Sequence, residues 1–193
     1  MRTLYLDCGM GAAGDMLTAA LLELLPEPES FVAELNGLGI PGVVFSAEKC
    51  QKCGISGTHM AVKVHGQEEG EAHPHTRGSL HDIRTIVQAL PVPTMVKLDI
   101  LSVYEEIAQA ESHVHGVPVN QIHFHEVGTL DAVADVTAVC LLLHRLNPEQ
   151  ILASPVHVGS GTVKCAHGIL PVPAPATAYL LWGIPMYGGG ISG

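Results

Sequence analysis

The sequence predicts an α/β fold, a layered sheet with flanking helices, and three observations support this prediction. Short apolar segments typical of strands alternate along the chain with longer segments of helical periodicity. Proline and glycine stand at the boundaries of these segments. Hydrophobic residues make up 47% of the 193 residues, enough to bury a substantial core. We expect a single domain at residues 1–187 with a mobile His-rich loop, and a glycine-rich linker at 188–193 toward a further C-terminal domain.

The first third of the chain is expected to begin with a strand and to continue with two helices and a hairpin. Pro26 and Pro28 stop the first helix, and Gly39 ends the second. Met60, Val62 and Val64 alternate with polar or small residues, as in a half-buried strand. The expected elements are a strand at 3–6, helices at 16–25 and 31–38, and hairpin strands at 43–49 and 58–64.

The remainder is expected to be mainly helical. Ser79 and Asp82 have the spacing of a capping box at the start of a helix. The segment 130–146 is apolar nearly all round, which is typical of a buried helix. The expected elements are helices at 79–90, 94–116 and 130–146, strands at 151–158 and 161–165, and a short helix ending at Trp182.

Composition excludes several classes of partner. The formal net charge is −10, and the nine Lys and Arg are scattered, so neither nucleic acid nor an anionic membrane is an expected partner. An apolar run of the ~18 residues needed to cross a bilayer is lacking, and so is a signal peptide, which favours a cytoplasmic location. The five cysteines are irregularly spaced, and Cys50-x-x-Cys53 alone is a weak metal or redox signal.

A glycine-rich loop follows the first strand. Gly9-x-Gly11-x-x-Gly14 has the glycine spacing of a dinucleotide-binding motif. That motif also requires a second strand that ends in an acidic residue ~20 positions later, and the sequence lacks such a strand. A looser ligand site remains open, in which Asp7 and Asp15 hold a divalent cation against a phosphate near the helix N-terminus. The alternative is that Asp15 is simply a favourable carboxylate in a first helical turn.

Histidines suggest metal chemistry. The chain has 12 of them and nine Lys and Arg, and three His-x-His pairs occur: His73/His75, His113/His115 and His123/His125. In an extended segment, residues i and i+2 point to the same side, so each pair can offer two imidazoles to one ion. Imidazole suits nickel, zinc, copper and iron. His59, His65 and His144 are expected to be surface or structural residues.

The stretch from His123 to Asp131 combines imidazoles and carboxylates. His123, His125 and Glu126 precede a helix on which Asp131 and Asp135 share one face. Like charges at i and i+4 repel by roughly 0.2–0.5 kcal/mol on an open helix, and a bound cation would relieve this. The alternative is a helix N-terminus where acidic residues are favoured by the helix dipole.

Several motifs in this order resemble the LarC family, the nickel insertion proteins of nickel-pincer cofactor biosynthesis. The motifs are Leu6-Asp7 with Gly11-Ala12-Ala13-Gly14-Asp15-Met16, His73-x-His75-x-Arg77 before Ser79-Leu80-x-Asp82-Ile83, His123-Phe124-His125-Glu126-Val127-Gly128, and His167-Gly168-x-x-Pro171-x-Pro173-Ala174-Pro175-Ala176-Thr177. The resemblance runs over essentially the whole chain and corresponds to the N-terminal part of the family.

The resemblance implies a CTP-dependent nickel chelatase or cyclometallase, classed as a lyase. Its substrate would be pyridinium-3,5-bisthiocarboxylic acid mononucleotide, and it would use Ni²⁺ together with CTP and Mn²⁺ or Mg²⁺. Family members usually continue past Gly193, and CTP binding is associated with that C-terminal part. The implied partners are therefore the pyridinium mononucleotide precursor and the C-terminal half, and these residues alone are expected to be inactive. A homo-oligomer is left open.

Residue roles follow as expectations. His123, His125 and Glu126 are candidate catalytic residues, and the loop is a candidate site for the cofactor or precursor through Asp7, Gly9, Gly11, Gly14 and Asp15. The candidate metal ligands are His73, His75, His113, His115, His123, His125, Glu126 and Asp131. Two rival functions remain: a non-catalytic nickel or zinc carrier, and a metal-dependent hydrolase. A purely structural interpretation leaves the three His-x-His pairs unexplained.

Overall fold

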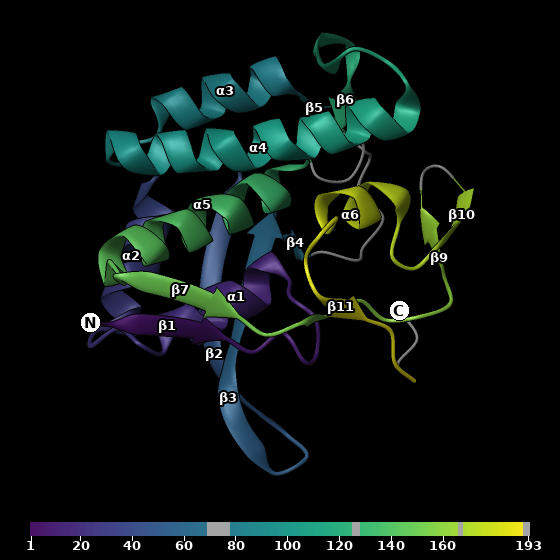
Figure 1. Ribbon diagram of the computed structural model, residues 1–193. Coiled ribbons are helices and arrows are strands. Elements are labelled where there is room, and N and C mark those ends of the chain that lie inside the picture. The colour runs from purple at the N-terminus through teal and green to yellow at the C-terminus, as the bar shows by residue number, and fades with distance from the viewer. Residues whose placement is uncertain (69–77, 125–127, 166–167, 191–193) are drawn as a thin grey trace. The chain divides into compact units, whose positions relative to one another are not determined.

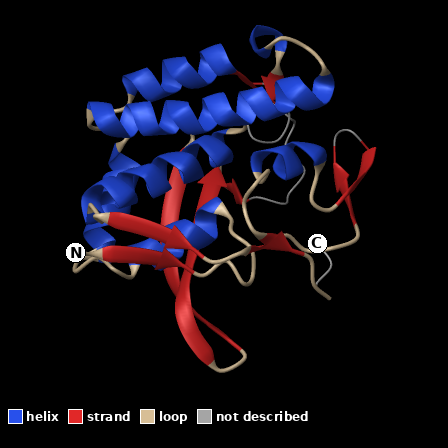
Figure 2. Ribbon diagram, viewed as in Figure 1, coloured by secondary structure: helices blue, strands red, loops and turns tan. Residues whose placement is uncertain are grey.

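The computed structural model describes residues 1–68, 78–124, 128–165 and 168–190 (Figure 1). In this part of the chain helices and strands are mixed, as Figure 2 shows, which confirms the α/β class. The strands form five small sheets rather than one layered sheet. The chain divides into two compact units. The central unit comprises Ala13–Val103 and His123–Asn147, and the terminal unit comprises Met1–Ala12, Tyr104–Ile122 and Pro148–Gly193.

The central unit is built on a long antiparallel hairpin with helices packed against it. Its helices are α1 (Gly14–Leu22), α2 (Pro28–Gly37), α3 (Leu80–Ala89), α5 (Leu130–Leu146) and the first part of α4 (Thr94–His115). Its strands are β2 (Val43–Lys52), β3 (Ile55–Val64), β4 (Gln67–Glu68), β5 (Gly78–Ser79) and β6 (His123–Phe124).

The hairpin strands extend further than the sequence pattern predicts. Every residue from Val43 to Lys52 pairs with β3, which leaves only Cys53 and Gly54 in the turn. Both have positive φ, 50° and 82°, which is the geometry of a type I′ turn and matches the twist of the strands. A two-residue turn therefore replaces the longer turn expected between residues 49 and 58.

The core of the central unit lies where α1 packs against both α5 and β3, which lie beside one another in Figure 1. Leu22 of α1 is 1% exposed, Met60 of β3 is 2% exposed and Leu142 of α5 is fully buried. The prediction that residues 130–146 form a buried helix is confirmed in its bounds. Burial of this kind stabilises by about 1.5–3 kcal/mol per large side chain.

The expected mobile loop at 66–78 begins differently from the prediction. His65 and Gly66, both at positive φ, turn the chain back so that β4 pairs with β3. Gly78 and Ser79 form β5, which pairs with β6. His73 and His75 lie outside the described residues.

The terminal unit contains short strands in pairs. Its elements are β1 (Thr3–Leu6), β7 (Gln150–Ala153), β8 (Val156–His157), β9 (Thr162–Cys165), β10 (Gly168–Pro171), α6 (Pro175–Leu180), β11 (Met186–Tyr187), the 3-10 turn Val119–Gln121 and the second part of α4. β1 pairs with β7 and β8 with β11 in parallel, and β9 with β10 antiparallel. The single strand predicted at 151–158 is interrupted at Ser154 and Pro155. There the Cys8 amide donates to the Ser154 hydroxyl rather than to a backbone carbonyl, and Pro155 has no N–H to donate.

β11 ends one residue before the predicted linker at 188–193, whose role stays a prediction. Over the described residues, every helix is too short or too polar to cross a membrane.

Candidate functional site

A small acidic cavity lies within the central unit. Its volume is about 140 Å³, and its lining includes the carboxylates Asp15, Asp131 and Asp135 together with His59. Met60, Ala61 and Val62 of β3 complete the lining. The lining thus includes residues that carry oxygen and nitrogen donors beside an apolar wall, around a space large enough for an ion and its waters.

The helices explain why these carboxylates meet. Asp15 lies in the first turn of α1 and Asp131 in the first turn of α5, and the two helices pack together. Asp135 follows Asp131 by one turn and so lies on the same helical face. All three are partly buried. Helix dipoles offset some of the repulsion between them, and a divalent cation would offset more.

Gly14 is required by the approach of α5 to α1. A Cβ atom built on Gly14 would lie 2.5 Å from Asp135 Cβ and 2.7 Å from Asp135 Oδ2. The carboxylate of Asp135 thus sits beside the N-terminus of α1, where the sequence suggested a phosphate. Gly14 therefore has a packing role here, and the α1 N-terminus already faces an anion of the protein itself.

Asp7, Gly9 and Gly11 belong to the terminal unit, since the boundary between the units falls after Ala12. The Gly9 amide donates to Asp7 Oδ1 at 2.9 Å, and the Gly11 amide donates to the Cys8 carbonyl at 3.0 Å. These two amides are therefore engaged within the loop itself. This arrangement lends no support to a phosphate cradle at Gly9 and Gly11, and ligand binding there stays a prediction.

The structure does not bring His113 and His115 together. Both lie in helix α4, where residues i and i+2 point about 160° apart, so the reasoning for an extended segment does not apply to this pair. The His113 ring stacks on Tyr179 with centroids 4.4 Å apart. The His115 imidazole lies 3.3 Å from a carboxylate oxygen of Glu111. Each ring thus has its own separate partner.

His123 lies in β6, paired with Ser79 of β5, and is exposed. Gly128 lies close by, because a Cβ there would be 2.6 Å from the Phe124 Cβ atom. His125 and Glu126 lie outside the described residues. Among the residues that the structure describes, no three His, Cys, Asp or Glu side chains are close enough to hold an ion as they stand. The acidic cavity is therefore a cation-attracting space rather than a finished coordination shell.

Sequence reasoning missed His59 as a residue of the site. It was expected to be a surface or structural histidine, and its exposure confirms the surface position, but it also belongs to the lining of the cavity with the three aspartates. The alternation of β3 gave little signal, because His59 is exposed while its neighbour Met60 is buried. Only the packing of α1 and α5 against β3 reveals the juxtaposition.

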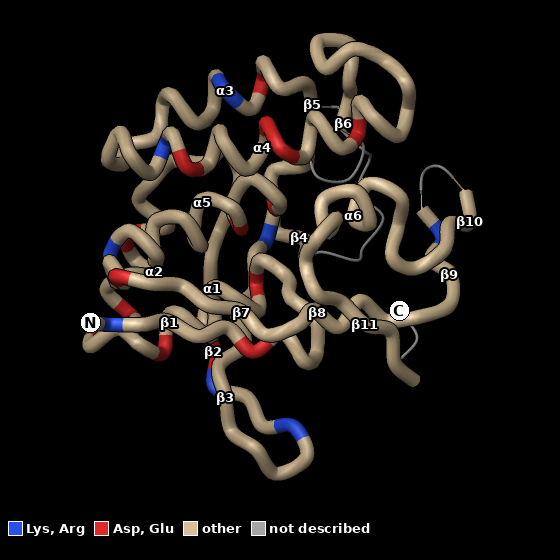
Figure 3. The backbone as a smooth tube through the Cα atoms, viewed as in Figure 1, with Lys and Arg blue, Asp and Glu red and all other residues tan. Residues whose placement is uncertain are grey.

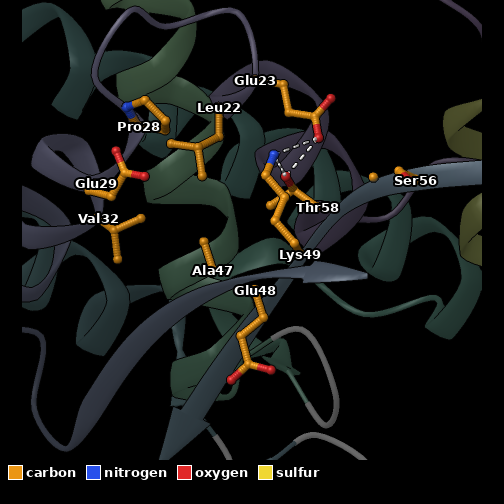
Figure 4. A pocket seen from close by; sticks show the side chains of 11 residues that line it. Leu22, Glu23, Pro28, Glu29, Val32, Ala47, Glu48, Lys49, Ser56 and Thr58 are labelled. Carbon is orange, nitrogen blue, oxygen red and sulfur yellow. Dashed lines mark hydrogen bonds and ion pairs between the residues drawn. The ribbon is translucent and has the colours of Figure 1, made fainter. Parts of the chain in front are cut away.

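A second cavity of about 620 Å³ lies near the other end of α1, as Figure 4 shows. Glu23, Lys49 and Thr58 form a network on its wall: Thr58 Oγ1 donates to Glu23 at 2.7 Å and accepts from Lys49 Nζ at 3.1 Å. The Thr58 hydroxyl, and to a lesser degree Lys49, hold the pKa of Glu23 below its ordinary value. Glu29 and Glu48 also line this cavity, so its wall is net negative and unsuited to an anionic ligand.

Comparison with known proteins decides the family. A family model described as "Nickel insertion protein" matches residues 4–193. The chain belongs to this nickel insertion protein family. No solved structure matches it.

Three curated relatives illustrate the nickel insertion family, each named pyridinium-3,5-bisthiocarboxylic acid mononucleotide nickel insertion protein. The protein of Desulfitobacterium hafniense is 41% identical over 193 residues, 100% of this chain and 46% of the relative. That of Clostridium kluyveri is 40% identical over 192 residues, 96% of this chain and 48% of the relative. That of Geobacillus kaustophilus is 36% identical over 189 residues, 96% of this chain and 46% of the relative. The chain spans about half the length of these relatives.

Among the described residues, the lining of the acidic cavity includes three carboxylates and His59, but no three of these side chains are close enough to hold an ion as they stand. Carboxylate and imidazole are ligands that Ni²⁺ accepts. Lys and Arg occur as single, separated positions along the chain (Figure 3), so neither described cavity offers a cluster of cations to an anionic substrate.

Proposed function

We propose that this chain supplies the nickel-handling part of an enzyme that inserts Ni²⁺ into pyridinium-3,5-bisthiocarboxylic acid mononucleotide to form the nickel-pincer cofactor. The observation that carries the proposal is the cavity whose lining includes Asp15, Asp131, Asp135 and His59. The names of relatives such as the Desulfitobacterium hafniense protein support the choice of reaction.

Nickel is a substrate in this reaction, so its site must capture the ion and then release it. Carboxylates favour capture because three partly buried anions share one small space. Release is favoured because no tight shell of three ligands is preformed among the described side chains. His73 and His75 are proposed to deliver the ion, and Glu126 to complete its ligands.

Forming a nickel–carbon bond displaces a proton from the substrate ring, which therefore requires a base. Neutral imidazole near pH 7 suits this role. We assign it to His123 or His125, which precede the helix that carries Asp131 and Asp135. Activation of the mononucleotide by CTP with Mn²⁺ or Mg²⁺ is assigned to the half of the protein that the relatives have beyond the matched residues.

The nickel site is tested by titrating the chain with Ni²⁺ in a calorimeter. Asp131→Asn combined with Asp135→Asn should weaken Ni²⁺ binding at least ~10-fold, roughly 1.4 kcal/mol, because two of the three anions lose their charge. Glu106→Gln, which removes an exposed carboxylate of α4, is the matched control and should bind as the unchanged chain does. Equal affinity of all three proteins would exclude the acidic cavity as the nickel site.

Catalysis is tested by combining the chain with the second half of a relative, CTP, Mg²⁺, Ni²⁺ and the precursor. His123→Ala with His125→Ala should abolish the nickel-containing product and leave the melting temperature of the chain unchanged. Nickel binding without any product would indicate a carrier, and product release without nickel would indicate a hydrolase.

A further inference from the structure

The parallel pair of β1 and β7 in the terminal unit is an incomplete sheet. The pair has four registered positions, from Thr3 with Gln150 to Leu6 with Ala153. Among the described residues, neither outer edge pairs with another strand. Parallel sheets in proteins are normally larger and covered on both faces. At one end the pairing continues, because the His157 amide of β8 donates to the Cys8 carbonyl at 3.0 Å.

One face of this pair is apolar and open. The register places Tyr5 beside Leu152 on one face and Leu4 beside Ile151 on the other, since side chains alternate along a strand. On β1 the two faces differ, because Tyr5 is 60% exposed whereas Leu4 and Leu6 on the opposite face are partly buried. On β7 both faces are open, with Leu152 46% exposed and Ile151 47% exposed. A run such as Ile151-Leu152-Ala153 is typical of a strand that is buried in a parallel sheet.

More exposed apolar side chains occur at the end of the same unit. Met186 and Tyr187 of β11 are 44% and 46% exposed, and Trp182 is 85% exposed. β11 pairs in parallel with β8, which follows β7 after two residues. The last described strand and the open face therefore belong to one compact unit. Residues that follow this strand in a longer chain would emerge from the unit that carries the face.

We infer that the second half of the protein binds to the Tyr5–Leu152 face and to an unpaired outer edge of the β1–β7 pair. The curated relatives are about twice as long as the matched region, with 46% of the Desulfitobacterium hafniense protein covered, so those proteins have a second half of comparable size that could cover such a face. The docked element is a polypeptide segment that adds to the strand edge and packs apolar side chains on Tyr5 and Leu152. This inference rests on the proposed function only in naming the second half as the partner.

The experiment measures association between the full chain and the separately produced second half of the Desulfitobacterium hafniense relative. Light scattering after size exclusion should give a one-to-one complex. Tyr5→Arg combined with Leu152→Arg should weaken association at least ~10-fold, because charges would be buried in an apolar contact. Leu152→Met, which keeps the side chain apolar and of similar volume, should retain it. The melting temperature of the double Arg variant, compared with that of the unchanged chain, separates a loss of contact from a failure to fold.

Ile169→Arg is the matched control, because Ile169 is 73% exposed on β10 of the same unit but lies outside the β1–β7 pair. Its complex should be as stable as that of the unchanged chain. Three results would overturn the inference: absence of any complex at micromolar concentration, equal weakening by Ile169→Arg, or self-association of the chain through Leu152. Ni²⁺ titration of the Tyr5→Arg/Leu152→Arg variant reports separately on the nickel site and should be unchanged.

Discussion

Gly14 is the residue on which the approach of Asp135 to α1 depends. Replacing it with Ala would place a methyl group against the Asp135 side chain, at 2.5 Å from its Cβ atom. We expect Gly14→Ala to destabilise the chain by about 1–3 kcal/mol through overpacking, and to weaken Ni²⁺ binding by displacing Asp135. Gly37→Ala is the control: it lies in α2 with nothing within 4 Å of its Cβ, so it should be neutral or stabilising. Urea denaturation compares the two, and equal stability would contradict the packing role.

Cys140 illustrates how burial controls reactivity at a single residue. Its thiol on α5 is 7% exposed, and burial, with a smaller contribution from Asp99, raises its pKa to about 12. At pH 8 the thiolate fraction is roughly 10⁻⁴. We expect iodoacetamide to modify the exposed Cys53 rapidly and Cys140 only after unfolding in urea, as measured by mass spectrometry. Rapid modification of Cys140 in the native chain would show that α5 opens readily.

At the scale of elements, α3 begins with a complete capping box. Ser79 Oγ accepts from the Asp82 amide at 3.2 Å, and Asp82 Oδ2 accepts from the Ser79 amide at 2.9 Å. We expect Ser79→Ala to destabilise the chain by about 1 kcal/mol at pH 7. Thr85→Ala, on an exposed position of the same helix, is the control.

The same box predicts a dependence on pH. Hydrogen bonds from the Ser79 side chain and backbone hold the pKa of Asp82 below its ordinary value of 3.8. A carboxyl group whose folded-state pKa is lowered stabilises the fold above the unfolded-state value, and this contribution is lost as the pH falls through the folded-state value. The difference in stability between the unchanged chain and Asp82→Asn should therefore shrink below pH 3.8. A difference that stays constant from pH 7 to pH 2 would contradict this linkage.

The elements also show what sequence patterns can and cannot predict. Caps and periodicity predicted α3, α4 and α5 well, because these signals are local. The sequence also placed Asp131 and Asp135 on one face of α5, where they line the cavity. It did not predict His59 as their neighbour, because that proximity depends on how α1 and α5 pack on β3. The two-residue strand β11 was also missed, since so short a segment has no measurable alternation.

For the whole molecule, the two units differ in how their strands are supported. The β2–β3 ladder has ten registered pairs and packs against α1 and α5, with Phe45 and Met60 at 3% and 2% exposure. The β1–β7 ladder has four pairs, and Ile151 and Leu152 are 47% and 46% exposed. Local opening requires less free energy where fewer apolar contacts are lost. The terminal sheet should therefore open more often than the hairpin.

Hydrogen exchange measured by mass spectrometry tests this difference in the isolated chain. Amides of residues 3–6 and 150–153 should exchange at least ~10-fold faster than those of 43–47 and 60–64, corresponding to about 1.4 kcal/mol in opening free energy. Amides of the exposed hairpin end, residues 49–58, serve as the internal control. They belong to a strand ladder but lie largely outside the core, so their exchange rate shows the effect of strand pairing without burial. If β1 and β7 exchange as slowly as the core of β2 and β3, the pair is already complete without further strands, and the reason for a covering partner disappears.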